Sequence, residues 1–146
     1  MLSALILNLI LAAVPAQPTD VPTELIPLII NRAIADAPTD VVLCIEIDGH
    51  DPSDKVLAAL QRPGRVIVAA SNCERVINVD RGSYERKTNH PAHFLSIASI
   101  LWKSRSRVEL QAEEYFNGKW GAHWTVRAHH VDGAWRIDLF HLDWRA

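Results

Sequence analysis

The chain has 146 residues, a length that suits one domain, and 49% of them are hydrophobic, which is enough to build a core. Its 15 Lys and Arg nearly balance its 17 Asp and Glu, giving a formal net charge of -2. This balance argues against a nucleic-acid or anionic-membrane partner and against a disordered chain.

The N-terminal residues have the pattern of a secretory signal peptide. Residues 2–14 are almost entirely apolar, and the run is too short to span a bilayer comfortably. Val14-Pro15-Ala16 then places small residues three positions and one position before the expected cleavage site, which precedes Gln17. No Lys or Arg precedes the apolar run, so an uncleaved anchor or an ordinary buried helix stays open as an alternative.

These features divide the chain into three parts. We expect a signal peptide over residues 1–16, a proline-containing linker over residues 17–22 and a single α+β domain over residues 23–146. The mature protein is then exported, periplasmic or secreted, and keeps no stable membrane span once the signal peptide is cleaved.

The N-terminal half of the domain alternates helices and strands. Thr23 is a suitable cap for a helix that runs to about residue 37, and β-branched residues predict strands over residues 41–47 and 66–70. Asp51 or Ser53 begins a short helix between these strands. Polar residues 80–91 predict a long loop.

The two cysteines fit the export interpretation. Cys44 lies in the first predicted strand and Cys73 follows the second. An oxidising compartment favours a Cys44–Cys73 disulfide, and the alternative is two reduced, buried thiols. The spacing of the cysteines is not that of a metal motif. His123 and His129 share a face of the predicted sheet but lie six residues apart, about 20 Å along a strand, so we expect no metal site and no cofactor.

Two turns set the register of the C-terminal third. Asp132-Gly133 is typical of a two-residue hairpin, and Asn117-Gly118 marks the turn before it. Alternation of apolar and charged residues then predicts which residues face each other. The predicted pairs are Leu110–Val126, Glu109–Arg127, Glu113–His123, His129–Arg136, Ala128–Ile137, Arg127–Asp138, Val126–Leu139 and Trp124–His141.

A further strand over residues 94–102 joins this sheet through a basic tip, in which Lys103, Arg105 and Arg107 are separated by serines. We interpret the tip as a solvated hairpin end rather than a phosphate site. The fold class is therefore α+β: a four-stranded or larger antiparallel meander packed against one or two N-terminal helices.

Charged side chains collect on the solvent face of this meander. They form either a polar ligand site or ordinary cross-strand pairs on a solvated sheet. His141 is expected on the packed face beside Trp124, as a hydrogen-bonded core histidine or a pocket residue. The candidate ligand-binding residues are Glu109, Glu113, His123, Arg127, Asp138 and His141.

The five tryptophans fall in or beside the meander, either as an aromatic platform for a ligand or as core packing. Trp120 and Trp144 lie at strand ends and are the pair expected to be exposed. No nucleophile motif, phosphate-binding glycine loop or zinc-protease motif is present in the sequence.

The order helix, strand, helix, strand and meander resembles the cystatin-like/NTF2-like α+β class, and the hairpin over residues 131–137 is similar to the last hairpin of such domains. The segments over residues 43–53 and 70–73 also resemble small exported bacterial proteins of unknown role. The catalytic Asp of ketosteroid-isomerase relatives has no counterpart here, so the resemblance implies a fold and no catalytic residue.

The sequence favours an exported, non-catalytic domain that binds an unknown small molecule or protein. The alternative is an isomerase- or hydrolase-type enzyme of the NTF2-like kind, with a pocket between helix and sheet. Glu114 and His141 are the acid–base candidates for that pocket.

Overall fold

The computed structural model describes residues 20–146, so the predicted signal peptide and the first half of the predicted linker, residues 17–19, lie outside the described residues. The elements are α1 (Leu25–Ala33), β1 (Val42–Ile47), α2 (Asp54–Leu60), β2 (Val66–Ala69), the 3-10 turn η1 (Ala70–Asn72), β3 (Cys73–Glu74), β4 (Tyr84–Glu85), β5 (Ala92–Ser104), β6 (Arg107–Asn117), β7 (Trp120–Val131) and β8 (Ala134–Arg145). No helix within residues 20–146 is long and apolar enough to cross a bilayer.

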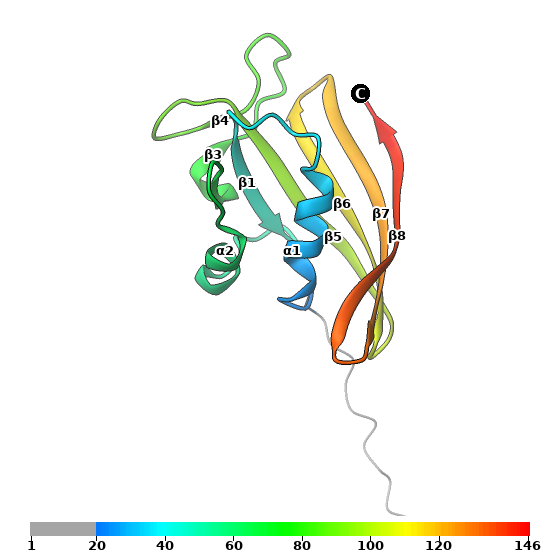
Figure 1. The fold of residues 1–146 in the computed structure, drawn as a ribbon. Coiled ribbons are helices and arrows are strands. Elements are labelled where there is room, and N and C mark those ends of the chain that lie inside the picture. The colour runs from blue at the N-terminus through cyan, green and yellow to red at the C-terminus, as the bar shows by residue number, and fades with distance from the viewer. Residues whose placement is uncertain (1–19) are drawn as a thin grey trace, which may run out of the picture.

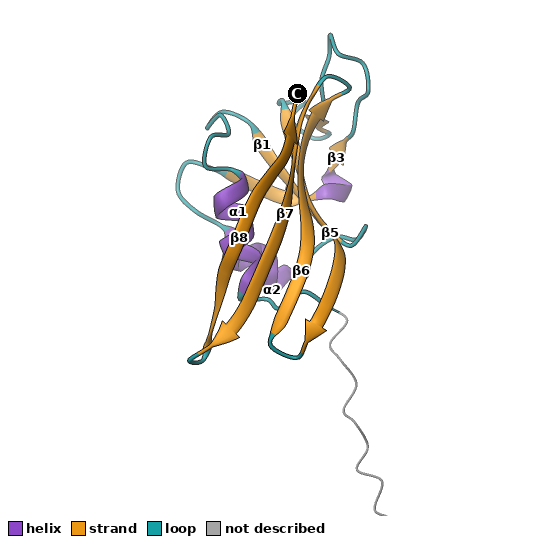
Figure 2. Cartoon of the chain, turned by 90° about the vertical axis from the view of Figure 1, so that its right-hand side faces the viewer, coloured by secondary structure: helices purple, strands orange, loops and turns teal. Residues whose placement is uncertain are grey.

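One six-stranded sheet dominates the structure, with the strand order β2-β1-β5-β6-β7-β8 (Figures 1 and 2). Strands β5 to β8 form the predicted antiparallel meander. The sheet is larger than four strands because β1 pairs in parallel with both β2 and β5. The β1–α2–β2 segment supplies the crossover that a parallel pair requires. The α+β prediction is therefore confirmed, with two parallel strands added at one edge.

The first helix is shorter than predicted, and the second is present where it was predicted. The first was expected over residues 23–37, but α1 covers Leu25–Ala33, and the chain beyond it continues as turns. Ser53 caps α2 as predicted, because its hydroxyl accepts a hydrogen bond from the Val56 N–H. The predicted loop over residues 80–91 contains the short strand β4, which pairs with β3 in a separate two-stranded sheet.

Helices α1 and α2 cover one face of the large sheet, which we call the inner face (Figure 1). The apolar side of α1 and alternate residues of the strands fill the space between them. Leu43, Leu95, Leu110 and Val126 are 0–1% exposed there. The opposite face of the sheet, the outer face, carries the polar side chains of β6, β7 and β8. This two-face division is the one that the alternating pattern predicts.

The pairing of β6 with β7 confirms the predicted register. Leu110 lies opposite Val126, Glu109 opposite Arg127 and Glu113 opposite His123. The turn itself contains two residues, Gly118 and Lys119, and a register shift between Tyr115 and Asn117 supplies the odd count.

The pairing of β7 with β8 is as predicted only near its turn. His129 lies opposite Arg136 and Ala128 opposite Ile137, but Asp138 is then an extra residue in β8. The predicted pairs Arg127–Asp138, Val126–Leu139 and Trp124–His141 are therefore wrong. Beyond the bulge the partners of Arg127, Val126 and Trp124 are Leu139, Phe140 and Leu142.

The bulge at Asp138 has a clear packing reason. A one-residue slip exchanges the two faces of a strand. Here it brings Phe140 to the inner face, where its ring lies 5.7 Å from that of Trp124. The same slip moves His141 to the outer face opposite Thr125, so the prediction that His141 lies on the packed face beside Trp124 is wrong.

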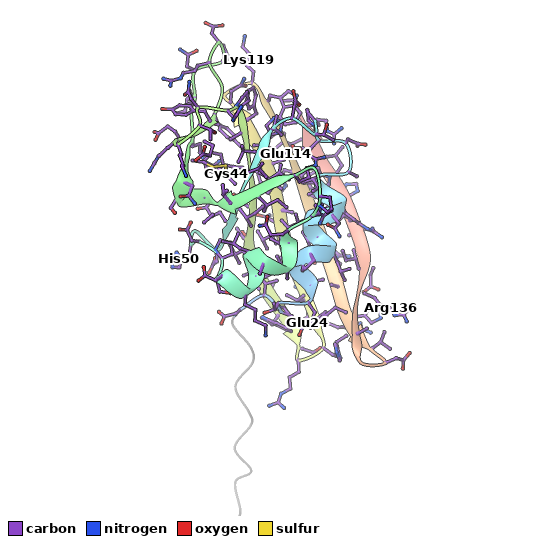
Figure 3. All side chains as sticks on the ribbon, turned by 60° about the vertical axis from the view of Figure 1, so that its left-hand side comes forward. Glu24, Cys44, His50, Glu114, Lys119 and Arg136 are labelled. Atoms are coloured by element: carbon purple, nitrogen blue, oxygen red, sulfur yellow. A yellow bond between two sulfur atoms is a disulfide. The ribbon has the colours of Figure 1, made fainter. Side chains whose placement is uncertain are left out.

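The predicted disulfide is present between Cys44 and Cys73. It lies on the outer face among Val42, Ala92 and Phe94, in a small second core (Figure 3 labels Cys44). The bond ties the segment after β2 to the centre of the sheet. Compared with two buried thiols, it removes chain entropy from the unfolded state.

Arg75 holds the segment after Cys73 against the same face. Its guanidinium group lies 3.4 Å from the carboxylates of both Glu46 and Glu113. It also lies over the rings of Phe94 and Tyr115, at 4.5 and 4.7 Å from their centroids. The disulfide and this arginine together cover the outer face at β1 and β5 and leave it open at β6 to β8.

We predict that the Cys44→Ala/Cys73→Ala variant loses stability through the unfolded state. The bond joins residues separated by 29 positions, and closing a loop of that size stabilises by about 3–4 kcal/mol in the chain-entropy model. Urea unfolding of the variant and the oxidised wild type measures the difference. A loss below about 1 kcal/mol would contradict the loop-closure argument.

A candidate ligand site on the outer face

The outer face of β6, β7 and β8 carries all six predicted ligand-binding candidates, but it divides them into two groups. One group lies toward the β5–β6 and β7–β8 turns, at the end marked by Arg136 in Figure 3. The other lies toward the end marked by Lys119. Arg127 and His123, one from each group, are four residues apart on β7, which corresponds to about 13 Å. No compact ligand can contact both groups fully.

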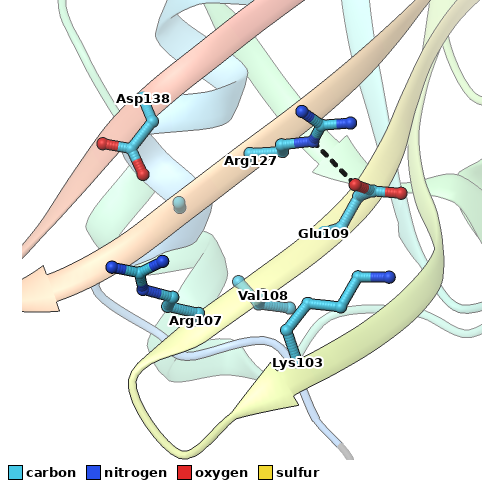
Figure 4. Close-up of a pocket in the computed structure, with 7 residues that line it drawn as sticks. Lys103, Arg107, Val108, Glu109, Arg127 and Asp138 are labelled. Atoms are coloured by element: carbon cyan, nitrogen blue, oxygen red, sulfur yellow. Dashed lines mark hydrogen bonds and ion pairs between the residues drawn. The ribbon is translucent and has the colours of Figure 1, made fainter.

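The first group surrounds a pocket of about 330 Å³ at the turn end of the outer face (Figure 4). Three predicted candidates, Glu109, Arg127 and Asp138, lie at its walls. The seven lining residues are Lys103, Arg107, Val108, Glu109, Arg127, Ala128 and Asp138. Val108 and Ala128 are each 2% exposed, so the pocket stands on backbone that the core holds in place.

The two carboxylates of this pocket are already engaged by neighbours on β7. The Arg127 Nε–H donates to Glu109 Oε2 at 2.7 Å, as the dashed line in Figure 4 shows. This hydrogen bond, with the charges of Arg127 and Lys103, lowers the pKa of Glu109. Asp138 Oδ1 lies 2.6 Å from His129 Nδ1. The predicted row of charges across β6, β7 and β8 is therefore present, and its members form cross-strand pairs. Asp138 pairs with His129, and not with Arg127 as predicted.

Two pocket cations have no such engagement. Within residues 20–146, the side chains of Lys103 and Arg107 form no hydrogen bond and no ion pair. Both belong to the basic tip, which turns through Arg105 and Ser106. The Ser106 carbonyl accepts a hydrogen bond from the His130 N–H at 2.8 Å, so the tip is attached to β7. The sequence predicted a solvated tip and did not identify Lys103 and Arg107 as pocket residues. They come close to Glu109 and Arg127 only when the strands pair in the folded sheet.

The second group centres on Asp143, which sequence reasoning missed. Asp143 Oδ2 accepts from the Thr125 hydroxyl at 2.9 Å and lies 2.8 Å from His123 Nδ1. Although burial raises the pKa of Asp143, these two hydrogen bonds outweigh it and lower that pKa. The side chain of His141 is 65% exposed, and its Nε2 lies 4.0 Å from Asp143. A second bulge in β8, at Asp143, brings this residue beside His123.

The exposed aromatic pair was predicted correctly. Trp120 is 36% exposed and Trp144 is 49% exposed. The Trp144 ring stacks on His123, with 6.1 Å between centroids and an interplanar angle of 9°. Glu113, the remaining candidate, is taken up by Arg75. This group therefore lies at an open surface, and in residues 20–146 no three His, Cys, Asp or Glu side chains are arranged to hold a metal ion.

Glu114 lies on the inner face in a buried pair with His93. Their side chains are 3% and 5% exposed, and His93 Nδ1 lies 2.8 Å from Glu114 Oε1. The rings of Phe116 and Trp120 lie 4.9 and 4.8 Å from the imidazole. Sequence reasoning did not join these two residues, because β5 pairs with both β1 and β6 only in the assembled sheet.

The buried pair lies apart from the five pockets described among residues 20–146, since His93 and Glu114 line none of them. The imidazole is instead enclosed by aromatic rings. The pair therefore acts first as a structural contact between β5 and β6.

Comparison of the chain with known protein families, curated proteins and solved structures gives no match. The resemblance to the cystatin-like/NTF2-like class therefore stays a prediction from the sequence.

We predict that Glu114→Ala destabilises the fold, because it leaves His93 in the core without its partner. Leaving a buried polar group without its hydrogen-bond partner costs about 1–3 kcal/mol. Urea unfolding measures the loss. The control is the double variant His93→Leu/Glu114→Met, which replaces both partners with apolar side chains and should recover most of the stability. Equal losses in the single and double variants would contradict the pairing.

We also predict that Glu109 titrates below its ordinary pKa of 4.5 and that Arg127→Gln raises the pKa toward that value. Because the folded state favours the carboxylate, the pair stabilises the fold above about pH 4.5, and this effect is lost as the pH falls through the lowered pKa. Carbon-detected NMR of the Glu109 carboxyl group measures its pKa in the wild type and in the Arg127→Gln variant. Lys103→Gln, which removes a smaller contribution, should raise the pKa less; the reverse order would contradict the geometry.

Proposed function

We propose that this chain is an exported, non-catalytic domain that binds a small ligand in the outer-face pocket. The observation that carries the proposal is the pocket itself. Three candidates selected from the sequence meet there with Lys103 and Arg107, whose side chains form no hydrogen bond and no ion pair within residues 20–146. Spare hydrogen-bond donors around a concave, core-supported surface are what a ligand site needs.

The packing of the inner face supports this location. Side chains from α1, α2 and the strands fill the centre of the inner face, and the pockets between helix and sheet lie at its edges, between α1 and β8 and beside Ile26, Ile47 and Val56. The outer face, in contrast, is open at β6 to β8. Long paired strands hold its side chains, so that little order has to be imposed when a ligand binds.

Export is proposed on two grounds. The intramolecular Cys44–Cys73 disulfide fits an oxidising compartment. The apolar segment over residues 2–14, followed by Val14-Pro15-Ala16, fits a signal peptide. In this proposal the ligand reaches the domain outside the cytoplasm, with no cofactor.

An isomerase- or hydrolase-type activity is the second candidate, and it rests on the buried His93–Glu114 pair. A histidine oriented by a carboxylate is a common general base. A substrate would reach it only if Trp120 moved away from the imidazole, since this ring lies 4.8 Å from it. Turnover of an ester or steroid by the wild type that is abolished in Glu114→Gln would favour this candidate over the binding domain.

The binding proposal predicts where ligands act. A library of small carboxylic acids, phosphates, sugars and amines is screened by amide NMR against the purified chain without a tag. We expect hits to shift resonances of residues 103, 107–109, 127, 128 and 138, which line the pocket. The Glu109→Gln/Arg127→Gln variant should weaken these hits while leaving the fold intact, because both side chains lie on the outer face.

The same screen contains its own control site. Leu28, Arg32 and Trp135 line a surface pocket between α1 and β8 and serve as the comparison. Hits that shift residues there and leave the outer-face pocket unchanged would refute the proposed location. Hits that are chemically converted by the protein would refute the non-catalytic role.

A further inference from the structure

From the same pocket we infer the class of its ligand: a small molecule that carries an anionic oxygen group, a phosphate or a carboxylate. This inference rests on the proposed function and goes one step beyond it. It also gives a role to the basic tip, which the sequence alone presents as a solvated hairpin end.

The first step concerns the negative charges at the pocket. Glu109 is held by Arg127 and Asp138 by His129, at 2.7 and 2.6 Å. A ligand cation would have to displace Arg127 or His129 from these carboxylates. It would also enter beside Lys103 and Arg107, which repel it. The pocket is therefore poorly suited to amines and metal ions.

The second step concerns the positive charges. Lys103, Arg107 and Arg127 line the pocket against the two carboxylates of Glu109 and Asp138, so these five side chains have one positive charge in excess, although the whole chain has a formal net charge of -2. The sign of the charge is thus reversed locally. A cleft with one sign of excess charge raises the local concentration of ligands of the other sign.

The third step concerns the chemistry of the unpaired side chains. Arg107 offers a planar fork of N–H donors, which matches two oxygens of one phosphate or carboxylate. Lys103 supplies a compact charge on a flexible stem. Arg107 and Lys103 lie on opposite strands of the β5–β6 hairpin, and Arg107 pairs with Ser104, the residue after Lys103. Figure 4 shows the two cations on either side of Val108. The oxyanion would bind between them, with Arg127 at the far wall.

The tip also contains a matched control. Arg105 is an exposed cation of the same K-S-R-S-R segment, yet it does not line the pocket. A general attraction of anions to the tip treats Arg105 and Arg107 alike. A site in the pocket depends on Arg107 and Lys103 and is indifferent to Arg105.

The experiment titrates inorganic phosphate, and separately citrate, into the full chain and follows binding by amide NMR at low and at moderate salt. We expect saturable shifts at residues 103–109 and 127–129. The Lys103→Gln/Arg107→Gln variant should weaken binding at least tenfold, and Arg105→Gln should change it less than twofold. Binding should weaken with added salt, because the pocket is open to solvent. The three exposed side chains can be replaced without loss of the core, which thermal unfolding checks.

A second arm distinguishes a free anion from a lipid headgroup. Vesicles of phosphatidylglycerol and of phosphatidylcholine are sedimented with each variant. One outcome is that phosphatidylglycerol vesicles sediment the protein and phosphatidylcholine vesicles do not, in a way that requires Lys103 and Arg107 but not Arg105. This result supports the same anion chemistry and identifies a lipid headgroup as the ligand. Saturable phosphate or citrate binding without vesicle binding supports a soluble ligand.

The outcomes separate this inference from the proposed function. If ligands of other chemistry bind the pocket and the Lys103→Gln/Arg107→Gln variant binds them normally, the ligand class is wrong and the binding site stands. Equal weakening in Arg105→Gln and Arg107→Gln overturns the inference, since it shows attraction to the tip as a whole. If neither anions nor any compound of the library shifts the pocket residues, both the inference and the proposed function fail.

Discussion

The structure depends on one constraint, which is that side chains alternate between the two faces of four long antiparallel strands. Alternate residues of β5, β6 and β7 enter the core under α1 and α2, those of β8 cover its edge as partly buried side chains, and the residues between them face outward. The pairing of β6 with β7 enforces this division most strongly, because Leu110 and Val126 meet on the inner face while Glu109 and Arg127 meet on the outer face. A slip of one residue would bury the charges and expose the core.

The bulges show how this constraint is reconciled with the sequence of β8. In a strict alternation, Leu139, His141 and Asp143 would all follow Ile137 onto the inner face. The extra residue at Asp138 changes the phase, so that Phe140 and Leu142 lie opposite the core residues Val126 and Trp124. The second bulge places Asp143 beside His123. Bulges are common where a strand must re-aim a side chain, and both of these lie in an edge strand.

The chemistry of the outer face follows from which charges are left over after pairing. Glu46 and Glu113 form ion pairs with Arg75, and Glu109 forms one with Arg127. Individual exposed pairs of this kind stabilise a fold by less than about 1 kcal/mol. At the pocket the Glu109–Arg127 pair engages a carboxylate, while within residues 20–146 the side chains of Lys103 and Arg107 form no hydrogen bond and no ion pair. The disulfide matters in the same way, since it closes one half of the outer face and leaves the other open.

Local signals in the sequence determined a good part of this arrangement. Asp132-Gly133 set the last hairpin, the alternation of residues 108–128 set the register of β6 and β7, and Ser53 began α2. The Cys44–Cys73 bond was predicted from two cysteines together with an expected signal peptide. Each of these depends on neighbours along the chain or on one short-range pairing, so the residue types alone carry the information. The six ligand-site candidates were likewise recognised as outward-facing charges, except for His141.

Tertiary structure alone decided the rest. The parallel placement of β1 between β2 and β5, the buried contact of His93 with Glu114, and the meeting of Lys103 and Arg107 with Glu109 and Arg127 join residues whose sequence separation carries no local pattern. The bulge at Asp138 was hidden for a related reason. The bulge is stabilised by the packing of Phe140 beside Trp124. Counting residues from the turn predicts which residues pair, but it takes no account of core packing.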